Sequence, residues 1–239
     1  GQGILGEQGE VEALEGMILD ISDRKQIENA LRYVNEHDEW TGLYNRGHLE
    51  TLLATDIDGR DGIGRAVISI NLTTIGVLAA QYGFHYARVL VKKAAEALNV
   101  LSSNKRVLFR THEYRFVFYV TDYADRTELD AFCGSIRDTL EAVLIADRIG
   151  GGIGVVEIAH ADGVRDVDLL LRRALVASER SAAEEAFGAV FFDRALELLV
   201  SREREIRSAL TALAAHDSRD ELFLQYQPII DLKTGSVCC

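Results

Sequence analysis

The sequence has 239 residues, of which 48% are hydrophobic and 27% are charged, and this length can bury a core without disulfides or metals. Its 26 lysine and arginine residues face 38 aspartate and glutamate residues, and the formal net charge of −12 argues against nucleic-acid binding. We find neither the long apolar run of a membrane span nor the basic and apolar start of an export signal. We therefore expect no membrane span in this segment and a cytoplasmic location.

The N-terminal part predicts one exposed helix over residues 22–37, whereas residues 1–16 show little periodicity. Ser22 and Asp23 suit a helix start. Apolar residues then recur at spacings of three and four, at Ile27, Ala30, Leu31 and Val34. One narrow apolar stripe on a charged helix is typical of a helix that pairs with a second copy, as in a short coiled coil.

Helices and strands alternate through the rest of the chain. Helices are expected over residues 46–55, 83–101, 125–146, 164–184 and 193–215. Strands are expected over residues 65–72, 107–109, 116–120, 150–159, 189–192 and 222–232. This order predicts an α/β or α+β fold, in which helices cover a sheet.

The hairpin between residues 107–109 and 116–120 has an unusual connection. Its six residues, RTHEYR at 110–115, include no glycine, asparagine, aspartate or proline. Tight hairpins favour residues that tolerate positive φ. We expect Arg115 and Glu113 to form a surface ion pair or a partner contact there.

Other candidate sites are weak when the residues are considered alone. Two acid pairs have too few neighbouring ligands for a cation site and are interpreted as solvated acids, Asp20 with Asp23 and Asp56 with Asp58. The six histidines never fall at the four-residue spacing of a helical zinc site. The string GGGIG at 150–154 precedes a strand instead of opening a helix, so it predicts a turn and a close-packed strand start rather than a phosphate loop. Cys133 is expected to be a buried thiol.

Five segments together resemble one family. DEWTGLYNR at 38–46 resembles the D-x-L-T-G-L-x-N-R segment of bacterial GGDEF domains, the diguanylate cyclases that condense two GTP into cyclic di-GMP; Trp40 replaces the usual leucine. The strand at 65–72, the helix at 83–101, the hairpin and the G-I-G strand at 152–154 follow at the family's spacing. The resemblance implies a GGDEF-like palm: a central, mostly antiparallel sheet flanked by helices.

Two flanking segments are similar to other signalling modules. GMILDISDRKQIENAL at 16–31 is similar to the last strand and exit helix of a PAS sensor domain, and LQYQPI at 224–229 resembles the opening strand of an EAL phosphodiesterase domain. The resemblance implies a piece of a PAS-GGDEF-EAL protein, with these parts: the end of the PAS domain and a linker helix at 1–37, the GGDEF-like domain at 38–195, a linker helix at 196–221, and a truncated EAL start at 222–239. The expected partners are the adjacent PAS and EAL domains and a second copy paired through the N-terminal helix.

The family's chemistry needs two Mg²⁺ ions held by carboxylates, cations on the phosphates, and glycines at the hairpin tip. The signature falls here on a segment that retains only the final phenylalanine: His112, Glu113, Tyr114, Arg115 and Phe116. The other family positions fall on Asn71 for a metal carboxylate, Gly76 and Glu179 for phosphate-binding lysines, and Ala79 and Arg88 for guanine-reading residues. The product-inhibition motif R-x-x-D falls on SNKR at 103–106, which lacks its arginine and its acid at the required places.

We therefore expect no catalytic residue, metal or cofactor in this segment. The favoured interpretation is an inactive domain that relays a sensor signal to a C-terminal EAL phosphodiesterase domain. Two alternatives remain open: a domain that binds GTP and thereby activates the EAL domain, and an active cyclase that uses Mg²⁺ and GTP. Phosphodiesterase activity would belong to the parent chain, because the metal-binding glutamate of an EAL enzyme would lie beyond residue 239.

Overall fold

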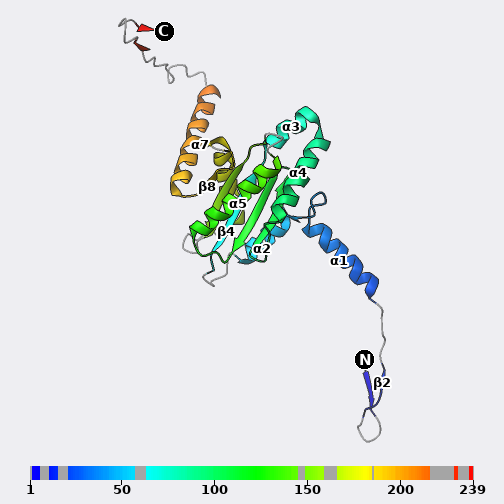
Figure 1. Ribbon diagram of the computed structural model, residues 1–239. Helices are drawn as coiled ribbons and strands as arrows, with labels where there is room; N and C mark the ends of the chain where they lie inside the picture. The colour runs from blue at the N-terminus through cyan, green and yellow to red at the C-terminus, as the bar shows by residue number, and fades with distance from the viewer. Residues whose placement is uncertain are drawn as a thin grey trace. The chain divides into compact units, whose positions relative to one another are not determined.

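A six-stranded sheet forms the centre of the structure, which is a computed structural model (Figure 1). The structure describes residues 2–5, 11–15, 21–56, 63–144, 149–158, 166–184, 186–215, 229–230 and 237–238. The chain divides into two units, Gly1–Phe192 and Asp193–Cys239, and the sheet belongs to the first.

The strands of this sheet lie in the order β3-β5-β6-β4-β7-β8. In that order their bounds are Tyr44–Asn45, Arg106–His112, Arg115–Thr121, Arg65–Asn71, Gly152–Ile158 and Ala189–Phe191. The four central strands pair antiparallel, and the short edge strands β3 and β8 pair parallel with β5 and β7. The predicted fold class, a mostly antiparallel central sheet flanked by helices, is confirmed.

Side chains alternate along the central strands, so each face of the sheet carries a core. On β6, Phe116 and Phe118 belong to the larger core, and Val117 and Tyr119 belong to the smaller one. The larger core includes residues of three helices, α3 (Thr74–Tyr82), α4 (Phe84–Asn99) and α5 (Arg126–Leu144). The smaller core includes residues of two helices, α2 (Arg46–Asp56) and α6 (Val167–Glu184).

Strand β7 and helix α6 approach each other closely because the strand carries glycine where it contacts the helix. A Cβ atom at Gly152 or Gly154 would lie less than 3.0 Å from backbone atoms of Ser178. The Ser181 hydroxyl accepts a 2.9 Å hydrogen bond from the Ile153 N–H and donates to the Gly188 carbonyl. The predicted close-packed strand start at residues 150–154 is thus confirmed.

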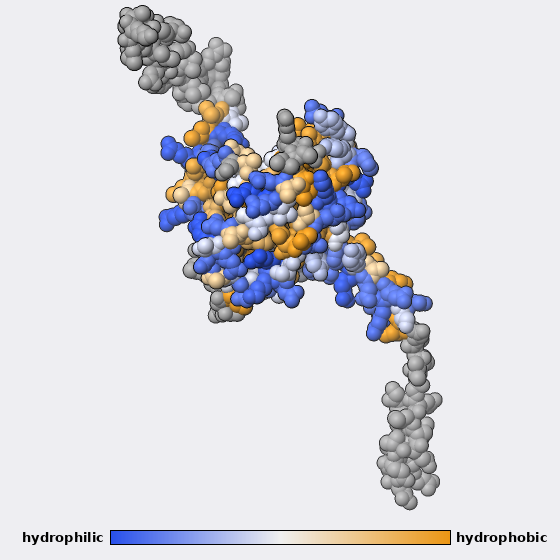
Figure 2. All heavy atoms as spheres, viewed as in Figure 1, coloured by the Kyte–Doolittle hydropathy of each residue, from blue (hydrophilic) through white to orange (hydrophobic). Residues whose placement is uncertain are grey.

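Helix α1 (Ser22–Glu36) confirms the helix predicted over residues 22–37. None of its residues is buried, and the exposed fractions of Ile27, Leu31 and Val34 are 61%, 60% and 72%. Figure 2 shows apolar and charged side chains together on the surface of α1. Near its C-terminal end, ring contacts join the helix to β3: Tyr33 stacks on His37 at 4.0 Å, and His37 meets Tyr44 in a tilted contact at 4.5 Å between centroids.

The region after β4 contains a helix that the sequence pattern does not predict. Helix α3 spans Thr74–Tyr82, where only a polar strand end is expected, and α4 starts after Gly83. Gly83 has φ of +88°, a backbone conformation that glycine adopts at little cost, and it separates the two helices. Only Ile75 and Ala79 of α3 are buried, which is too few positions to show a clear helical period.

The sequence also fails to predict two short hairpins. Strand β1 (Gln2–Leu5) pairs with β2 (Val11–Glu15), and β9 (Ile229–Ile230) pairs with β10 (Val237–Cys238). Helix α7 (Arg194–Ala215), in the second unit, confirms the helix predicted over 193–215. The rest of the strand expected at 222–232 lies outside the described residues. Of the helices that the structure describes, none combines the length and apolar character needed to cross a membrane.

Candidate functional site

The tip of the β5–β6 hairpin is shorter than the six-residue connection expected from the sequence. Strand β5 continues to His112 and β6 begins at Arg115, so only Glu113 and Tyr114 form the turn. The register is irregular between Arg110 and His112, which is the mark of a bulge. Among the described non-glycine residues, positive φ occurs at Asp122 and Phe187 and at no residue of this tip. The turn therefore needs no residue that tolerates positive φ, which explains why it contains no glycine, asparagine or aspartate.

Tyr114 lies at this tip and packs on helix α3. An added Cβ at Gly76 would lie 3.1 Å from Cε2 of the Tyr114 ring. The Tyr114 carbonyl accepts a 2.9 Å hydrogen bond from the Leu72 N–H, which ties the tip to the end of β4. A side chain at position 76 would have to displace the Tyr114 ring.

Trp40 occupies the neighbouring space, between two arginines. The guanidinium carbons of Arg88 and Arg110 lie 4.5 and 4.8 Å from the centre of a Trp40 ring, within the range of cation–π attraction. The cavity that remains beside Tyr114 has a volume of about 20 Å³, which is room for about one water molecule. Ala79 is 6% exposed, one turn after Gly76 on α3. Gly76 and Arg88 thus border a space that Trp40 and Tyr114 fill.

Arg115 forms an ion pair with Glu179 of α6 and not with Glu113, so the expected ion pair between residues 113 and 115 is wrong, and the alternative, a partner contact, stays a prediction. Nη2 of Arg115 lies 3.1 Å from Oε1 of Glu179. Glu113 is instead contacted through its backbone carbonyl, which accepts a 3.1 Å hydrogen bond from Nη2 of Arg110. Asn71 lies opposite Arg115 in the β4–β6 register, is 2% exposed, and accepts a 3.1 Å hydrogen bond from the Thr73 N–H.

The structure therefore brings some of the sequence-predicted positions together and separates others. Asn71, Arg115 and Glu179 lie at one end of the sheet, where β4, β6 and α6 meet. Phe116 points into the larger core as a packing residue. His112 lies on the other side of the hairpin from Tyr114, because it lines a cavity beside α6 that does not include Tyr114.

A buried ion pair that the sequence does not predict holds the DEWTGLYNR segment to β5. Nη1 of Arg110 donates to both carboxylate oxygens of Asp38, at 2.8 and 2.7 Å. The backbone N–H and the hydroxyl of Thr41 donate to Oδ1 of Asp38, at 2.9 and 2.7 Å. Burial alone would raise the pKa of Asp38, but the hydrogen bonds from Arg110 and Thr41 outweigh it and hold the pKa below the ordinary value of 3.8. The signal that could have indicated this pair is an arginine inside an otherwise apolar strand.

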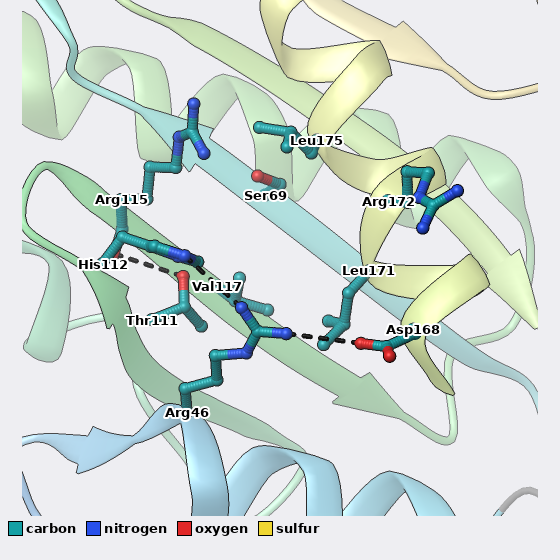
Figure 3. A pocket seen from close by; sticks show the side chains of 10 residues that line it. All are labelled: Arg46, Ser69, Thr111, His112, Arg115, Val117, Asp168, Leu171, Arg172 and Leu175. Carbon is teal, nitrogen blue, oxygen red and sulfur yellow. Dashed lines mark hydrogen bonds and ion pairs between the residues drawn. The ribbon is translucent and has the colours of Figure 1, made fainter. Parts of the chain in front are cut away.

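A second cavity, of about 250 Å³, lies between α2, the hairpin and α6, on the side of the smaller core (Figure 3). Arg46 crosses its mouth: Nη1 lies 3.4 Å from Nε2 of His112, and Nη2 lies 3.3 Å from Oδ1 of Asp168. Burial lowers the pKa of His112 below its ordinary value of 6.5, and the charges of Arg46 and Arg115 lower it further. The sequence singles out His112 and Arg115 of its lining as signature positions, but it does not predict this cavity.

Side chains that could bind a metal ion do not cluster in the part of the chain that the structure describes. No group of three or more histidine, cysteine, aspartate or glutamate side chains is placed there to hold a metal ion. Asp56 accepts a 2.9 Å hydrogen bond from the Tyr119 hydroxyl, and burial together with this bond raises the pKa of Tyr119. Asp20 and Asp58 lie outside the described residues. Cys133 is buried, as predicted.

Comparison with known proteins gives curated relatives and solved structures with a similar fold. A curated protein from Caulobacter vibrioides, named only an uncharacterized signaling protein, is 28% identical over 229 residues, which cover 92% of this chain and 28% of that protein. The chain thus spans less than a third of the length of this relative. The coiled coil and GGDEF domain of DgcB from Caulobacter crescentus, solved in complex with c-di-GMP, has a TM-score of 0.62 at 13% identity, over 72% of this chain and 93% of that one.

A Vibrio cholerae protein, LapD, provides a neighbour with further domains. Its S helix-GGDEF-EAL structure, bound to c-di-GMP, has a TM-score of 0.60 at 20% identity, over 73% of this chain and 41% of that one. At these identities the two structures show a shared fold. The family model described as diguanylate cyclase, GGDEF domain, matches residues 35–183, which is more than half of the chain and includes the whole hairpin site. The chain belongs to the GGDEF family.

Proposed function

We propose that this GGDEF domain is catalytically inactive and that it transmits signals within a cyclic di-GMP signalling protein. The observation that carries the proposal is the filled space at the hairpin tip. Tyr114 packs against Gly76, Trp40 lies between Arg88 and Arg110, and the cavity left beside them is about 20 Å³. Pockets that hold a ligand of nucleotide size usually have about 300 Å³ or more, so a nucleotide does not fit without displacing these side chains.

The charges at the end of the sheet support the same proposal independently. The family resemblance implies an acid at position 115 and a lysine at position 179, one for metal and one for phosphate. Here the signs are exchanged, and Arg115 and Glu179 pair with each other at 3.1 Å. Asn71 beside them carries no charge. An arginine repels a divalent cation and a glutamate repels a phosphate, so neither contact of the family chemistry can form with these residues.

We expect no saturable heat when GTP with Mg²⁺ is titrated into the protein in an isothermal calorimeter, and no cyclic di-GMP in the product mixture. Loss of even one metal or oxyanion contact typically lowers an enzyme's rate by about 10² to 10³, and several contacts are absent here. An active GGDEF domain run in the same buffer provides the positive control. Micromolar binding without product would favour the GTP-binding activator of an EAL domain, and formation of cyclic di-GMP would establish the active cyclase; either result contradicts the proposal.

The flanking segments suggest what the domain connects. We assign residues 1–37 to the end of a PAS domain and its linker helix, 38–195 to the GGDEF domain, 196–221 to a second linker helix, and 222–239 to the start of an EAL domain. LapD of Vibrio cholerae, which joins an S helix, a GGDEF domain and an EAL domain, supports this order by similarity of fold. In this proposal a phosphodiesterase reaction belongs to the EAL domain of the parent chain, and the GGDEF domain relays the state of the sensor to it.

Helix α1 is the part that could pair two copies. Its apolar stripe of Ile27, Leu31 and Val34 is exposed by 60% or more at each position. The ring contacts from Tyr33 through His37 to Tyr44 attach the helix to β3. A change in the pairing of two α1 helices would therefore reach the edge of the sheet directly. Such a relay requires two states of the helix pair.

We expect the wild-type protein to dimerise and the Leu31→Asp variant to remain monomeric in sedimentation velocity experiments. Burying two copies of Leu31 in a dimer stabilises it by about 3 kcal/mol or more, which is over a hundredfold in dissociation constant. Asn29→Asp adds the same charge on the opposite side of the same exposed helix and should leave the dimer intact. A monomeric wild-type protein, or equal losses in both variants, would exclude pairing through this stripe.

A further inference from the structure

The cavity shown in Figure 3 has an unusual charge for a protein of net charge −12. Three arginines line it, and each comes from a different element: Arg46 from α2, Arg115 from β6 and Arg172 from α6. The carboxylate in its lining is that of Asp168. Guanidinium groups held on a rigid frame are the usual protein device for recognising carboxylate and phosphate groups.

The three arginines differ in how far their charge is already neutralised. Arg46 pairs with Glu50 at 2.5 Å and with Asp168 at 3.3 Å, and Arg115 pairs with Glu179 at 3.1 Å. For Arg172, the described part of the chain provides no ion pair or hydrogen bond. Arg172 is thus the cation of this cavity whose charge a ligand can satisfy without breaking an existing ion pair.

Neutral hydrogen-bonding groups lie between these cations. The hydroxyls of Ser69 and Thr111 line the cavity, and Ser69 is 4% exposed. His112 lies 3.4 Å from Nη1 of Arg46. Burial and the charges of Arg46 and Arg115 lower its pKa, whereas Glu50 opposes this shift. A bound anion would offset the arginine charges and raise the pKa of His112 again, so binding and protonation of this ring should favour each other.

The rest of the lining is apolar and sets the size of a ligand. Val117, Leu171 and Leu175 form this part. The volume of about 250 Å³ equals that of about eight water molecules at roughly 30 Å³ each, which suits a compact metabolite. The cavity adjoins the smaller core, whereas Gly76 and Tyr114 pack with the larger core, so it is separate from the filled space at the hairpin tip.

We propose that this cavity binds a small organic oxyanion, a carboxylate or a phosphate monoester, that carries a compact apolar body. The oxyanion lies against Arg172 and Arg115. The hydroxyls of Ser69 and Thr111 rotate away from their present partners, the Ser178 hydroxyl and the Arg115 carbonyl, and donate to it. The apolar body packs on Leu171 and Leu175. Such a ligand would join α2, the hairpin and α6, so the domain itself would respond to a metabolite, whether or not it binds GTP.

Binding of benzoate and phenyl phosphate to the full chain tests this proposal. Two matched probes serve as controls: inorganic phosphate lacks the apolar body, and benzyl alcohol lacks the charge. Amide chemical shifts in NMR spectra give both the affinity and the place of binding. We expect one of the two aromatic anions to bind saturably, at least about tenfold more tightly than inorganic phosphate and benzyl alcohol, with shifts at Ser69, Thr111 and Leu175. The tighter of the two identifies the oxyanion as carboxylate or phosphate.

Two variants of α6 separate a specific site from general charge attraction. Arg172→Gln removes an exposed side chain of the cavity and should weaken the tighter probe at least about tenfold without loss of folding. Arg180→Gln makes the same change on the same helix, at a residue that pairs with Glu184 and does not line the cavity, and should leave affinity unchanged. Equal effects of the two substitutions, or aromatic anions that bind no better than inorganic phosphate, would overturn the proposal.

Discussion

Replacing Gly154 with alanine should strongly destabilise the native fold of the GGDEF domain. The added Cβ would lie less than 3.0 Å from three backbone atoms of helix α6: the Ser178 nitrogen, the Ala174 oxygen and the Ala177 carbonyl carbon. Backbone atoms inside a helix cannot move aside as the end of a flexible side chain can. Helix α6 would therefore have to separate from β7, which lies between β4 and β8 in the sheet.

The expected loss is large because α6 also carries part of the smaller core. Leu170 and Ala174 are each 1% exposed in that core and would both lose contacts if α6 moved. Overpacking alone typically costs about 1 to 3 kcal/mol, and unburying a leucine adds about 1.5 to 3 kcal/mol. We expect a loss of about 4 kcal/mol or more in the free energy of unfolding, which is close to the whole stability of many domains. Urea unfolding followed by circular dichroism measures it.

Gly134→Ala is the matched control. Gly134 lies in helix α5, and the nearest atom to an added Cβ is the end of the Arg137 side chain, 4.0 Å away. Alanine in an unstrained helix position should raise stability by about 0.5 to 1 kcal/mol. A Gly154→Ala protein as stable as the Gly134→Ala protein would show that α6 does not pack on β7 as closely as the structure has it.

The sequence indicated that residues 150–154 pack closely, because glycines at the start of a strand have few other uses. It could not indicate the partner, since the contact at Gly154 joins residues from separate elements and only the folded chain brings Ser178 there. At the hairpin, by contrast, the sequence pattern predicts the wrong local structure. Polar residues before a strand are usually read as a loop, yet Arg110 continues β5 and is only 7% exposed because Asp38 neutralises it.

The motif predicts which residues take the positions of the candidate site, but it does not predict how they are arranged. Spacing from the D-x-L-T-G-L-x-N-R segment is enough to locate residues 112–116 and Glu179. Sequence proximity suggested Glu113 as the partner of Arg115, whereas α6 brings Glu179 to it from across the fold. Similarly, the sequence shows that Tyr114 stands where the family signature has an acid, but the packing of Tyr114 on Gly76 depends on the unpredicted helix α3.

Substituting Asp38 with asparagine should lower the free energy of unfolding by about 3 kcal/mol at neutral pH. Removal of one partner from a buried ion pair leaves the other charge uncompensated, which typically costs about 3 to 5 kcal/mol. The side chain of Arg110 is 6% exposed and that of Asp38 is 20% exposed. We expect the lower end of the range, because asparagine retains an oxygen that can accept the hydrogen bonds from Thr41.

The matched control is Asp122→Asn, which removes an ion pair on the surface. Asp122 pairs with Lys105 at 2.5 Å, and both side chains are 61% exposed. Exposed pairs contribute about 0 to 1 kcal/mol, so the change should be small. Asp122 has φ of 55°, which asparagine tolerates well, so the substitution adds no backbone strain. Similar losses from both substitutions would mean that the Asp38–Arg110 pair is no stronger than a surface pair.

The same pair makes a prediction about pH, because the pKa of Asp38 in the folded protein lies below 3.8. A carboxyl whose pKa is lowered by folding stabilises the fold when it is ionised and loses that contribution as the pH falls through its folded pKa. The difference in stability between the wild type and Asp38→Asn should therefore be constant above about pH 5 and shrink as the pH falls below 3.8.

Trp40 is the single tryptophan of the chain, and Arg110 stacks on it, so its fluorescence reports unfolding at this place. Arg110 also donates to the carbonyl of Glu113, so loss of the pair should loosen the hairpin tip and shift Trp40 emission even before unfolding. A stability difference that does not change with pH would show that the charge of Asp38 does not hold this tip.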